Sequence, residues 1–314
     1  SYASSPQVLY LCYGLGGLGV GVLYGISISC ALQWFPEKRG LATGLVVFGF
    51  GAGTAFFNWF IQRLLESMGL QSSLMVIGFF MLITLFPLSL FYKYPPKDST
   101  SMFGAEKRTI SASPNFTPIE MLKTHQWYLI YFSFTLTVSI VLMFGAQMKM
   151  LAKEFSLPKN YFDVLLVLFP LGNGLSRIVA GVVSDEIGRE KTMMIFYAFL
   201  GLSILCFISL SHIPLFFVTL VFIATLLGGA PFALYPAIIG DYYGTRYSTT
   251  NYGFTYTAKS WAGLISGWLI GYLVMQFGSY KVPLFIIALG SLLAAFLSSP
   301  FLLKAPINKK NVLA

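Results

Sequence analysis

The sequence predicts an all-α polytopic membrane protein, and its composition carries the prediction. Of the 314 residues, 56% are hydrophobic and only 10% are charged, whereas soluble domains carry about 25% charged residues. Glycine is common, as in membrane helices, with 30 residues in all. The length would allow two soluble domains, but a chain this apolar would leave them without a polar surface.

Nine apolar runs are long enough to cross the hydrocarbon core, which takes about 20 residues of helix. We expect spans at roughly 7–33, 41–65, 72–92, 127–149, 161–183, 193–211, 213–239, 252–275 and 282–303. Residues 93–126 are rich in Pro, Ser, Thr and charge, which indicates a solvated linker. The chain is thus divided into residues 1–92 with three spans, the linker, residues 127–303 with six spans, and a tail at 304–314.

The distribution of basic residues predicts the orientation. Of the twenty Lys and Arg residues, thirteen lie on the side of the linker and the C-terminus, five on the other side and two inside spans. Because cytoplasmic loops carry excess Lys and Arg, we expect the linker and the C-terminus in the cytoplasm. The net charge of +9 then reflects membrane topology and not a nucleic-acid partner. The kind of membrane and the oligomeric state have no signature in the sequence.

The two basic residues inside spans are Arg177 and Lys259. On a helical wheel at about 100° per residue, each lies on a stripe of small and polar residues. The stripe around Lys259 includes Tyr252 and Tyr256, and the one around Arg177 includes Asn173. Small residues allow close approach of neighbouring helices, so both cations are expected to point into the bundle and away from lipid.

Both cations are expected at one depth, roughly 10 Å from the cytoplasmic ends of their spans. Every Asp and Glu except Asp163 falls in a loop or at a helix end, and Asp163 lies about four turns from Arg177. Two cations without a counter-ion favour a ligand that brings negative charge. The alternative is that each cation is structural, bound to a buried acid or carbonyl or snorkelling to the interface.

Other classes of protein are less compatible with the sequence. A membrane enzyme or metal site would need His, Asp, Glu or Cys clustered within spans, and the sequence has no such cluster. We therefore expect no catalytic residue, no metal and no cofactor. A receptor or a non-transporting scaffold stays open as an alternative.

Three motifs carry a resemblance to a known family. GVVSDEIGREK at 181–191 resembles the loop signature Gly-x-x-x-Asp-(Arg/Lys)-x-Gly-(Arg/Lys)-(Arg/Lys) of the major facilitator superfamily. Gly181, Asp185, Gly188 and Arg189 match, while Glu186 and Glu190 stand where basic residues are usual. With QWFPEKRGLATGLVVFGFGAG at 33–53 and NYGFTYTAK at 251–259, the chain resembles the oxalate:formate antiporters, which are close to the monocarboxylate transporters.

The resemblance implies a fold and a binding site. The nine spans would match the fourth to twelfth of twelve helices, so that residues 1–92 would be a partial N-terminal half and the first three helices would be absent. Arg177 and Lys259 match the Arg and Lys that bind the carboxylate substrate in that family, and Tyr252 and Tyr256 are candidates for its aromatic lining. A truncated remnant without transport is the alternative to a working carrier.

The resemblance also predicts mechanism. Proton-coupled monocarboxylate carriers have an Asp one turn before the Arg, where this chain has Asn173, and Asn cannot take up a proton. We therefore expect exchange or facilitated diffusion of small mono- or dicarboxylates. Asp185 is expected to face the N-terminus of the helix that begins near Gly40, where a carboxylate stabilises the helix by about 0.3–1 kcal/mol.

Overall fold

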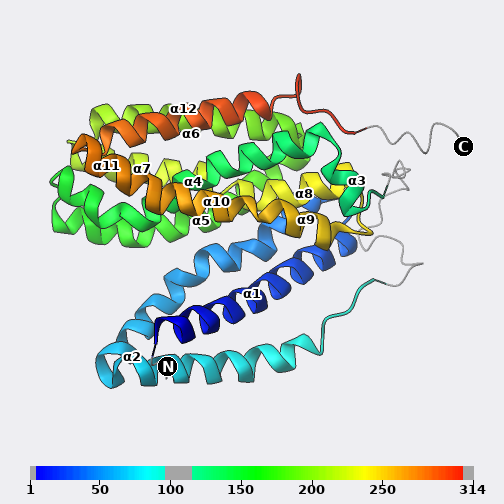
Figure 1. The fold of residues 1–314 in the computed structure, drawn as a ribbon, viewed down its shortest axis with the longest axis horizontal. Coiled ribbons are helices and arrows are strands. Elements are labelled where there is room, and N and C mark those ends of the chain that lie inside the picture. Colours follow the sequence, from blue (N-terminus) through cyan, green and yellow to red (C-terminus); the bar gives the residue numbers. More distant parts are fainter. Residues whose placement is uncertain (1–4, 96–114, 307–314) are drawn as a thin grey trace, which may run out of the picture.

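The computed structural model describes residues 5–95 and 115–306, and within these ranges the protein is helical without a β-strand (Figure 1). In chain order the elements are α1 (Pro6–Trp34), α2 (Arg39–Ser89), α3 (Pro118–Leu122), α4 (His125–Glu154), α5 (Lys159–Ile187), α6 (Arg189–Leu210), α7 (Pro214–Gly228), α8 (Pro231–Tyr243), α9 (Ser248–Tyr256), α10 (Ala258–Leu264), the π-helix η1 (Ile265–Leu269), α11 (Ile270–Phe277) and α12 (Lys281–Leu297).

The predicted class, an all-α polytopic membrane protein, is confirmed. In the described part of the chain, seven helical stretches are long and apolar enough to cross a membrane. The predicted span at 282–303 coincides instead with a shorter apolar helix, Lys281–Leu297. The count of nine spans therefore stays a prediction.

Helix α2 consists of two limbs that reverse direction at Gly69. Its φ of 71° lies in the left-handed region that glycine adopts without steric cost. The limbs coincide with the predicted spans at 41–65 and 72–92, and α1 runs alongside them in Figure 1. Helices α1 and α2 thus form one body, which lies apart from the larger body of α4 to α12 over much of its length.

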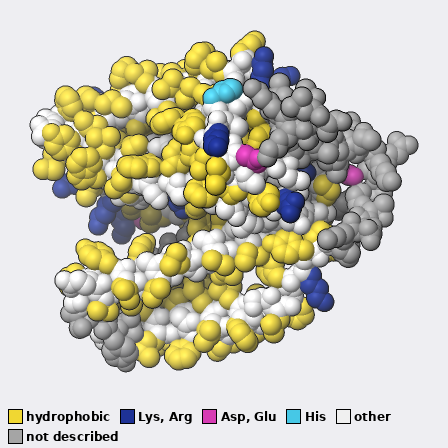
Figure 2. All heavy atoms as spheres, turned by 45° about the vertical axis from the view of Figure 1, so that its right-hand side comes forward, with side chains coloured by type: hydrophobic (Ala, Val, Ile, Leu, Met, Phe, Trp, Pro, Cys, Tyr) yellow, Lys and Arg dark blue, Asp and Glu magenta, His cyan; other side chains and the backbone are white. Residues whose placement is uncertain are grey.

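The larger body contains two buried apolar clusters, one around Phe134 and Tyr235 and one around Phe144, Phe207 and Phe217. Its outer surface is also apolar, as the yellow side chains in Figure 2 show. A soluble protein rarely exposes such a large continuous apolar area. Hydrocarbon chains of lipid are the environment that suits it.

The predicted linker at 93–126 is too long at its C-terminal end. Phe116 and Met121 are buried against the larger body, and Thr117 caps α3 by a reciprocal pair of hydrogen bonds with Glu120. The sequence did not predict this short helix, because the segment is polar on average. Its two buried apolar residues and its capping box do not change that average. Residues 96–114 of the linker and 307–314 of the tail lie outside the described residues.

Two of the predicted spans are interrupted helices. The run at 213–239 is broken between α7 and α8 at Gly229 and Ala230, directly before Pro231, which has no N–H to continue the hydrogen-bond ladder. The run at 252–275 is broken at Thr257 and contains the π-helix η1. Interrupted helices at membrane depth commonly flank transport sites, since their free backbone groups need a protein or water-lined surrounding.

The two bodies meet closely at one end, where α2 begins and α5 ends. A Cβ atom on Gly40 would come within 2.5 Å of the Gly181 carbonyl oxygen, and one on Gly44 would overlap the Arg177 carbonyl. Only glycine permits such an approach of two helix backbones. Away from this contact the bodies diverge (Figure 1), and the space-filling view shows the molecule hollowed between them (Figure 2).

Candidate anion-binding site

Arg177 lies on α5, where its backbone comes close to Gly44 of α2, and its side chain is buried with 2% exposure. Its Nη1 donates to the Val47 carbonyl of α2, and its Nη2 lies 3.5 Å from Asn173 Oδ1, at the long limit of a hydrogen bond. Its Nε has no hydrogen-bond partner among the described residues. The guanidinium group therefore keeps donor capacity that its surroundings do not use.

Lys259 lies on α10, two residues after the break at Thr257. Its side chain is half-buried, and its Nζ donates to the Tyr256 hydroxyl at 3.1 Å. An ammonium group has three donors, and this is the only hydrogen bond recorded for it within the described chain. Lys259 thus has capacity for further acceptors.

Two phenylalanine rings connect the cations. The Arg177 guanidinium carbon lies 4.8 Å from the Phe232 ring centre and 5.8 Å from that of Phe50. Lys259 Nζ lies 5.6 Å and 5.4 Å from the same two rings. Because both cations share both rings, the inward orientation predicted from the helical wheel brings them together. The group of Arg177, Lys259, Phe50 and Phe232 is called the cation site below.

Three tyrosines adjoin the cation site. The predicted pair Tyr252 and Tyr256 have ring centres 5.5 Å apart, and Tyr24 of α1 lies 5.1 Å from Tyr256 and 6.3 Å from Tyr252. The hydroxyl groups of Tyr24 and Tyr252 are buried without a partner in the described residues. Each hydroxyl can both donate and accept a hydrogen bond, so the two add polar capacity beside the cations.

Charge balance distinguishes this site from the rest of the core. No Asp or Glu of residues 5–95 and 115–306 forms an ion pair with Arg177 or Lys259. Asp163, the acid nearest to a span interior by sequence, is exposed. The rings supply part of the compensation, since a cation over an aromatic face gains about 0.5–2 kcal/mol.

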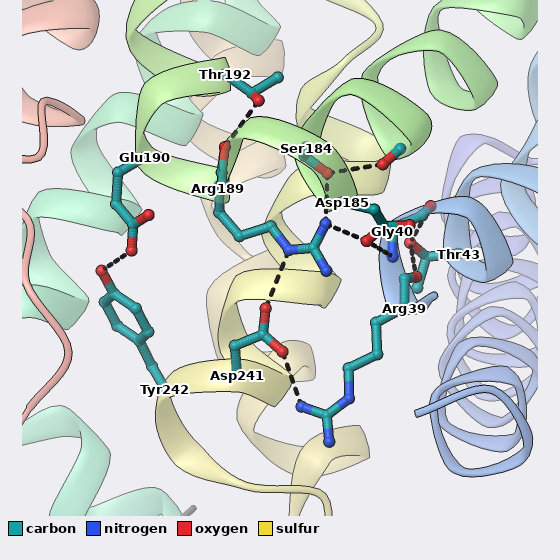
Figure 3. Close-up of polar contacts among 12 residues, drawn as sticks. Arg39, Gly40, Thr43, Ser184, Asp185, Arg189, Glu190, Thr192, Asp241 and Tyr242 are labelled. Carbon is teal, nitrogen blue, oxygen red and sulfur yellow. Dashed lines mark hydrogen bonds and ion pairs between the residues drawn. The ribbon is translucent and has the colours of Figure 1, made fainter. Parts of the chain in front are cut away.

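A different group of charges holds the two bodies together at their contact (Figure 3). Asp185 accepts hydrogen bonds from the backbone N–H groups of Gly40 at 3.0 Å and Leu41 at 2.9 Å. These N–H groups belong to the first turn of α2 and have no acceptor within the helix. The predicted contact of Asp185 with the helix that begins near Gly40 is therefore present.

Two Arg and two Asp side chains complete this contact, which is called the closed junction below. Arg189 binds Asp185 at 2.6 Å and Asp241 at 3.0 Å, and Asp241 also binds Arg39 at 2.8 Å. Figure 3 shows the four side chains as one chain of ion pairs across α2, α5, α6 and α8. Arg39 and Asp241 were not predicted, because neither belongs to the loop signature.

The remaining signature residues shape the turn between α5 and α6. Gly188 has a φ of 95°, a conformation that favours glycine, and Gly181 permits the backbone contact with Gly40. Glu190, which departs from the signature, accepts a hydrogen bond from the Tyr242 hydroxyl. Glu190 thus has a hydrogen-bond partner within this chain, although it departs from the signature.

The match to a protein family covers the chain. The model of the Major Facilitator Superfamily matches residues 1–149 and 128–314. The fold and the closed junction define a polytopic membrane transporter, and the chain belongs to this superfamily.

Individual relatives match nearly the whole chain. The chain is 30% identical to the oxalate:formate antiporter of Oxalobacter formigenes over an alignment of 296 residues. This alignment covers 94% of the chain and 69% of the relative. The chain is 31% identical over 309 residues to an uncharacterized 38 kDa protein of Thermoproteus tenax, covering 98% and 75%. Similarity to monocarboxylate transporter 12-B of Danio rerio is 27% over 316 residues, covering 91% and 66%.

Proposed function

We propose that the chain transports small organic anions, mono- or dicarboxylates, by exchange or facilitated diffusion, with Arg177 and Lys259 binding the carboxylate. The observation that carries the proposal is the convergence of two cations on the same two rings, with no acid of the described residues paired to either. The printed names of two relatives, an oxalate:formate antiporter and a monocarboxylate transporter, support the same class of substrate.

Binding of a carboxylate would replace a contact between the two bodies. Without ligand, Arg177 Nη1 donates to the Val47 carbonyl of α2. A carboxylate is the stronger acceptor, because it is charged and receives two parallel N–H bonds from the planar guanidinium. Lys259 would bind the same anion from α10, and Tyr252, Tyr256 and Asn173 would line its surroundings.

Exchange follows from the charge of the empty site. Two cations in a dry cavity repel each other, and an anion removes that repulsion. A conformational change with the site empty is therefore slower than one with the site occupied, which favours release of one anion only when another replaces it. Alternating access would come from rocking the body of α1 and α2 against the larger body.

The structure would represent a state in which the two bodies are in contact at the closed junction and separated at the opposite end. We place the junction on the cytoplasmic side, as the distribution of basic residues predicts. Asn173, one turn before Arg177, offers no proton acceptor. This supports exchange or facilitated diffusion over proton coupling.

Ligand binding tests the proposal directly. The purified chain is titrated with oxalate and with formate, and its melting temperature is followed, because a ligand specific for the native state raises it. We expect a rise that Arg177→Gln and Lys259→Gln abolish. Lys191→Gln, at an exposed lysine of α6, is the matched control and should keep the full rise.

Uptake into liposomes separates transport from mere binding. Vesicles containing the chain should take up labelled oxalate when preloaded with unlabelled oxalate, and much less when empty. Binding without uptake would favour a receptor. A ligand-induced shift that persists in Lys259→Gln would show that the lysine is structural.

A further inference from the structure

A second polar cavity lies at the end of the larger body away from the closed junction. It has a volume of about 380 Å³, is open to the surface, and is lined by the C-terminal end of α4, the turn between α6 and α7, and the turn between α11 and α12. The polar and charged side chains used below are Glu154, His212 and Lys281. None of them belongs to the cation site or the closed junction.

Glu154 is held rigidly at the edge of this cavity. Its Oε1 accepts from the Ser279 hydroxyl at 2.7 Å and from the Tyr280 backbone N–H at 3.0 Å, while its Oε2 has only the same N–H at 3.2 Å. A carboxylate has about four acceptor positions. Glu154 is thus a fixed negative group with unused acceptor capacity.

Donors lie around the same cavity. Ser211 is 2% exposed, and its hydroxyl has no hydrogen-bond partner among the described residues. This hydroxyl lies behind the cavity surface and is not among the donors used below. Lys281 and His212 are exposed on the cavity lining, so an ammonium and an imidazole supply its nitrogen donors.

The position of the cavity narrows the class of ligand. It lies where membrane-spanning helices end, which is the depth of lipid headgroups. Large apolar side chains are exposed beside it on α11 and α7, with Met275 at 85% and Leu215 at 63%. Acyl chains can pack along such a surface while a polar group occupies the cavity.

We propose that this cavity binds the headgroup of a phospholipid that carries both a phosphate and a primary ammonium, as phosphatidylethanolamine does. The phosphate accepts hydrogen bonds from Lys281, with His212 beside it. The ammonium donates to the free positions of Glu154. Both charges of the headgroup thereby meet a group of opposite sign, whereas the headgroup of phosphatidylglycerol has no ammonium for Glu154. The inference does not depend on the proposed transport function.

Lipid titration of the full chain in detergent tests the assignment. Phosphatidylethanolamine should raise the melting temperature more than phosphatidylglycerol or phosphatidylcholine, whose quaternary ammonium has no N–H. The N-monomethyl and N,N-dimethyl lipids should give intermediate rises. Lys281→Gln and Glu154→Gln should each weaken the apparent affinity about tenfold, the equivalent of one charge-assisted hydrogen bond.

Two matched controls at the same end of the molecule are Lys159→Gln and Asp163→Asn, which change exposed residues outside the cavity. Both should retain the wild-type affinity. Because Glu154 also binds the turn before α12, Lys281→Gln is the decisive variant if Glu154→Gln fails to fold. Equal stabilisation by all three lipid classes, or an unchanged affinity in Lys281→Gln, would overturn the assignment. Protection by soluble phosphoethanolamine equal to that by the lipid would refute a lipid ligand.

Discussion

The cation site and the closed junction both include residues of α2, α5 and α8, and they differ in how their charges are balanced. At the junction, Arg39 and Arg189 meet Asp185 and Asp241, and each charge has an opposite partner. At the cation site, Arg177 and Lys259 have aromatic rings and a carbonyl but no acid. The charges of the closed junction thus hold the structure together in pairs, whereas those of the cation site are left without acidic partners in the described residues.

The largest expected effect is that removing a cation lowers the thermal stability at the closed junction but does not lower it at the cation site. Arg189→Met leaves two Asp carboxylates without their shared partner, and removal of one member of a buried ion pair costs about 3–5 kcal/mol. Lys259→Met removes an uncompensated charge and should leave the melting temperature of the ligand-free chain unchanged or raise it. Thermal unfolding without carboxylate measures both. A marked loss of stability in Lys259→Met would show that the lysine has a structural partner and would remove the contrast.

An intermediate effect is expected from giving the cation site its own acid. Asn173→Asp places a carboxylate about one hydrogen-bond length from Arg177, where Asn173 Oδ1 lies 3.5 Å from Nη2. The ionised Asp competes with the ligand, so the affinity for oxalate should fall about tenfold at neutral pH. Protonation of the introduced Asp at lower pH removes the competing charge, so the affinity relative to that of the wild type at the same pH should recover.

The control for this substitution is Asn173→Ser, which removes the amide without adding charge. Its affinity should vary with pH as the wild type does. If Asn173→Asp binds oxalate as tightly as wild type at neutral pH, the ligand does not use Arg177 and the site has been misassigned.

The smallest expected effect concerns the rings that replace acids at the cation site. Phe232 lies over the Arg177 guanidinium at 4.8 Å. A double-mutant cycle of Phe232→Leu and Arg177→Met should give a coupling of about 1 kcal/mol in the stability of the ligand-free chain. The cycle cancels the cavity that Phe232→Leu creates by itself. Zero coupling would mean that the ring is only packing.

The sequence was sufficient to predict the two cations of the cation site, Arg177 and Lys259, and the direction in which they point. Helical periodicity gave the inward face of the helices that carry Arg177 and Lys259, and residue counts gave their common depth. Since each inference needs only the residue's own helix, no contact between helices had to be known. The resulting pair lies on two shared rings in the structure, while its role in binding stays a prediction.

The rest of the site could not be predicted, because it is contributed by other helices. Tyr24, Phe50 and Phe232 come from α1, α2 and α8, and a helical wheel does not show which helix is the neighbour or at which register. The breaks at Gly229 and Thr257 were missed for a related reason, since hydropathy averages over the backbone conformation. Gly229 is required by its close approach to Asn173 on α5, a contact that only the tertiary structure shows.

The interrupted helix that carries Lys259 also has a consequence for how the protein is made. The stretch Ser248–Phe277 has a mean hydropathy of 1.2, against 1.6 to 2.3 for the other candidate spans of the described chain. A central lysine adds about 3 kcal/mol to the free energy of membrane insertion. The stretch would therefore enter the bilayer poorly by itself.

Its polar contacts are with a helix that is synthesised earlier. Trp127 of α4 donates to Thr255 at 3.1 Å, and Tyr131 of α4 bonds Thr257 at 3.0 Å, on either side of Tyr256. Because α4 leaves the ribosome first, these two side chains are already within the membrane when the later stretch emerges. We therefore expect the insertion of the segment that carries Lys259 to depend on a helix made more than a hundred residues before it.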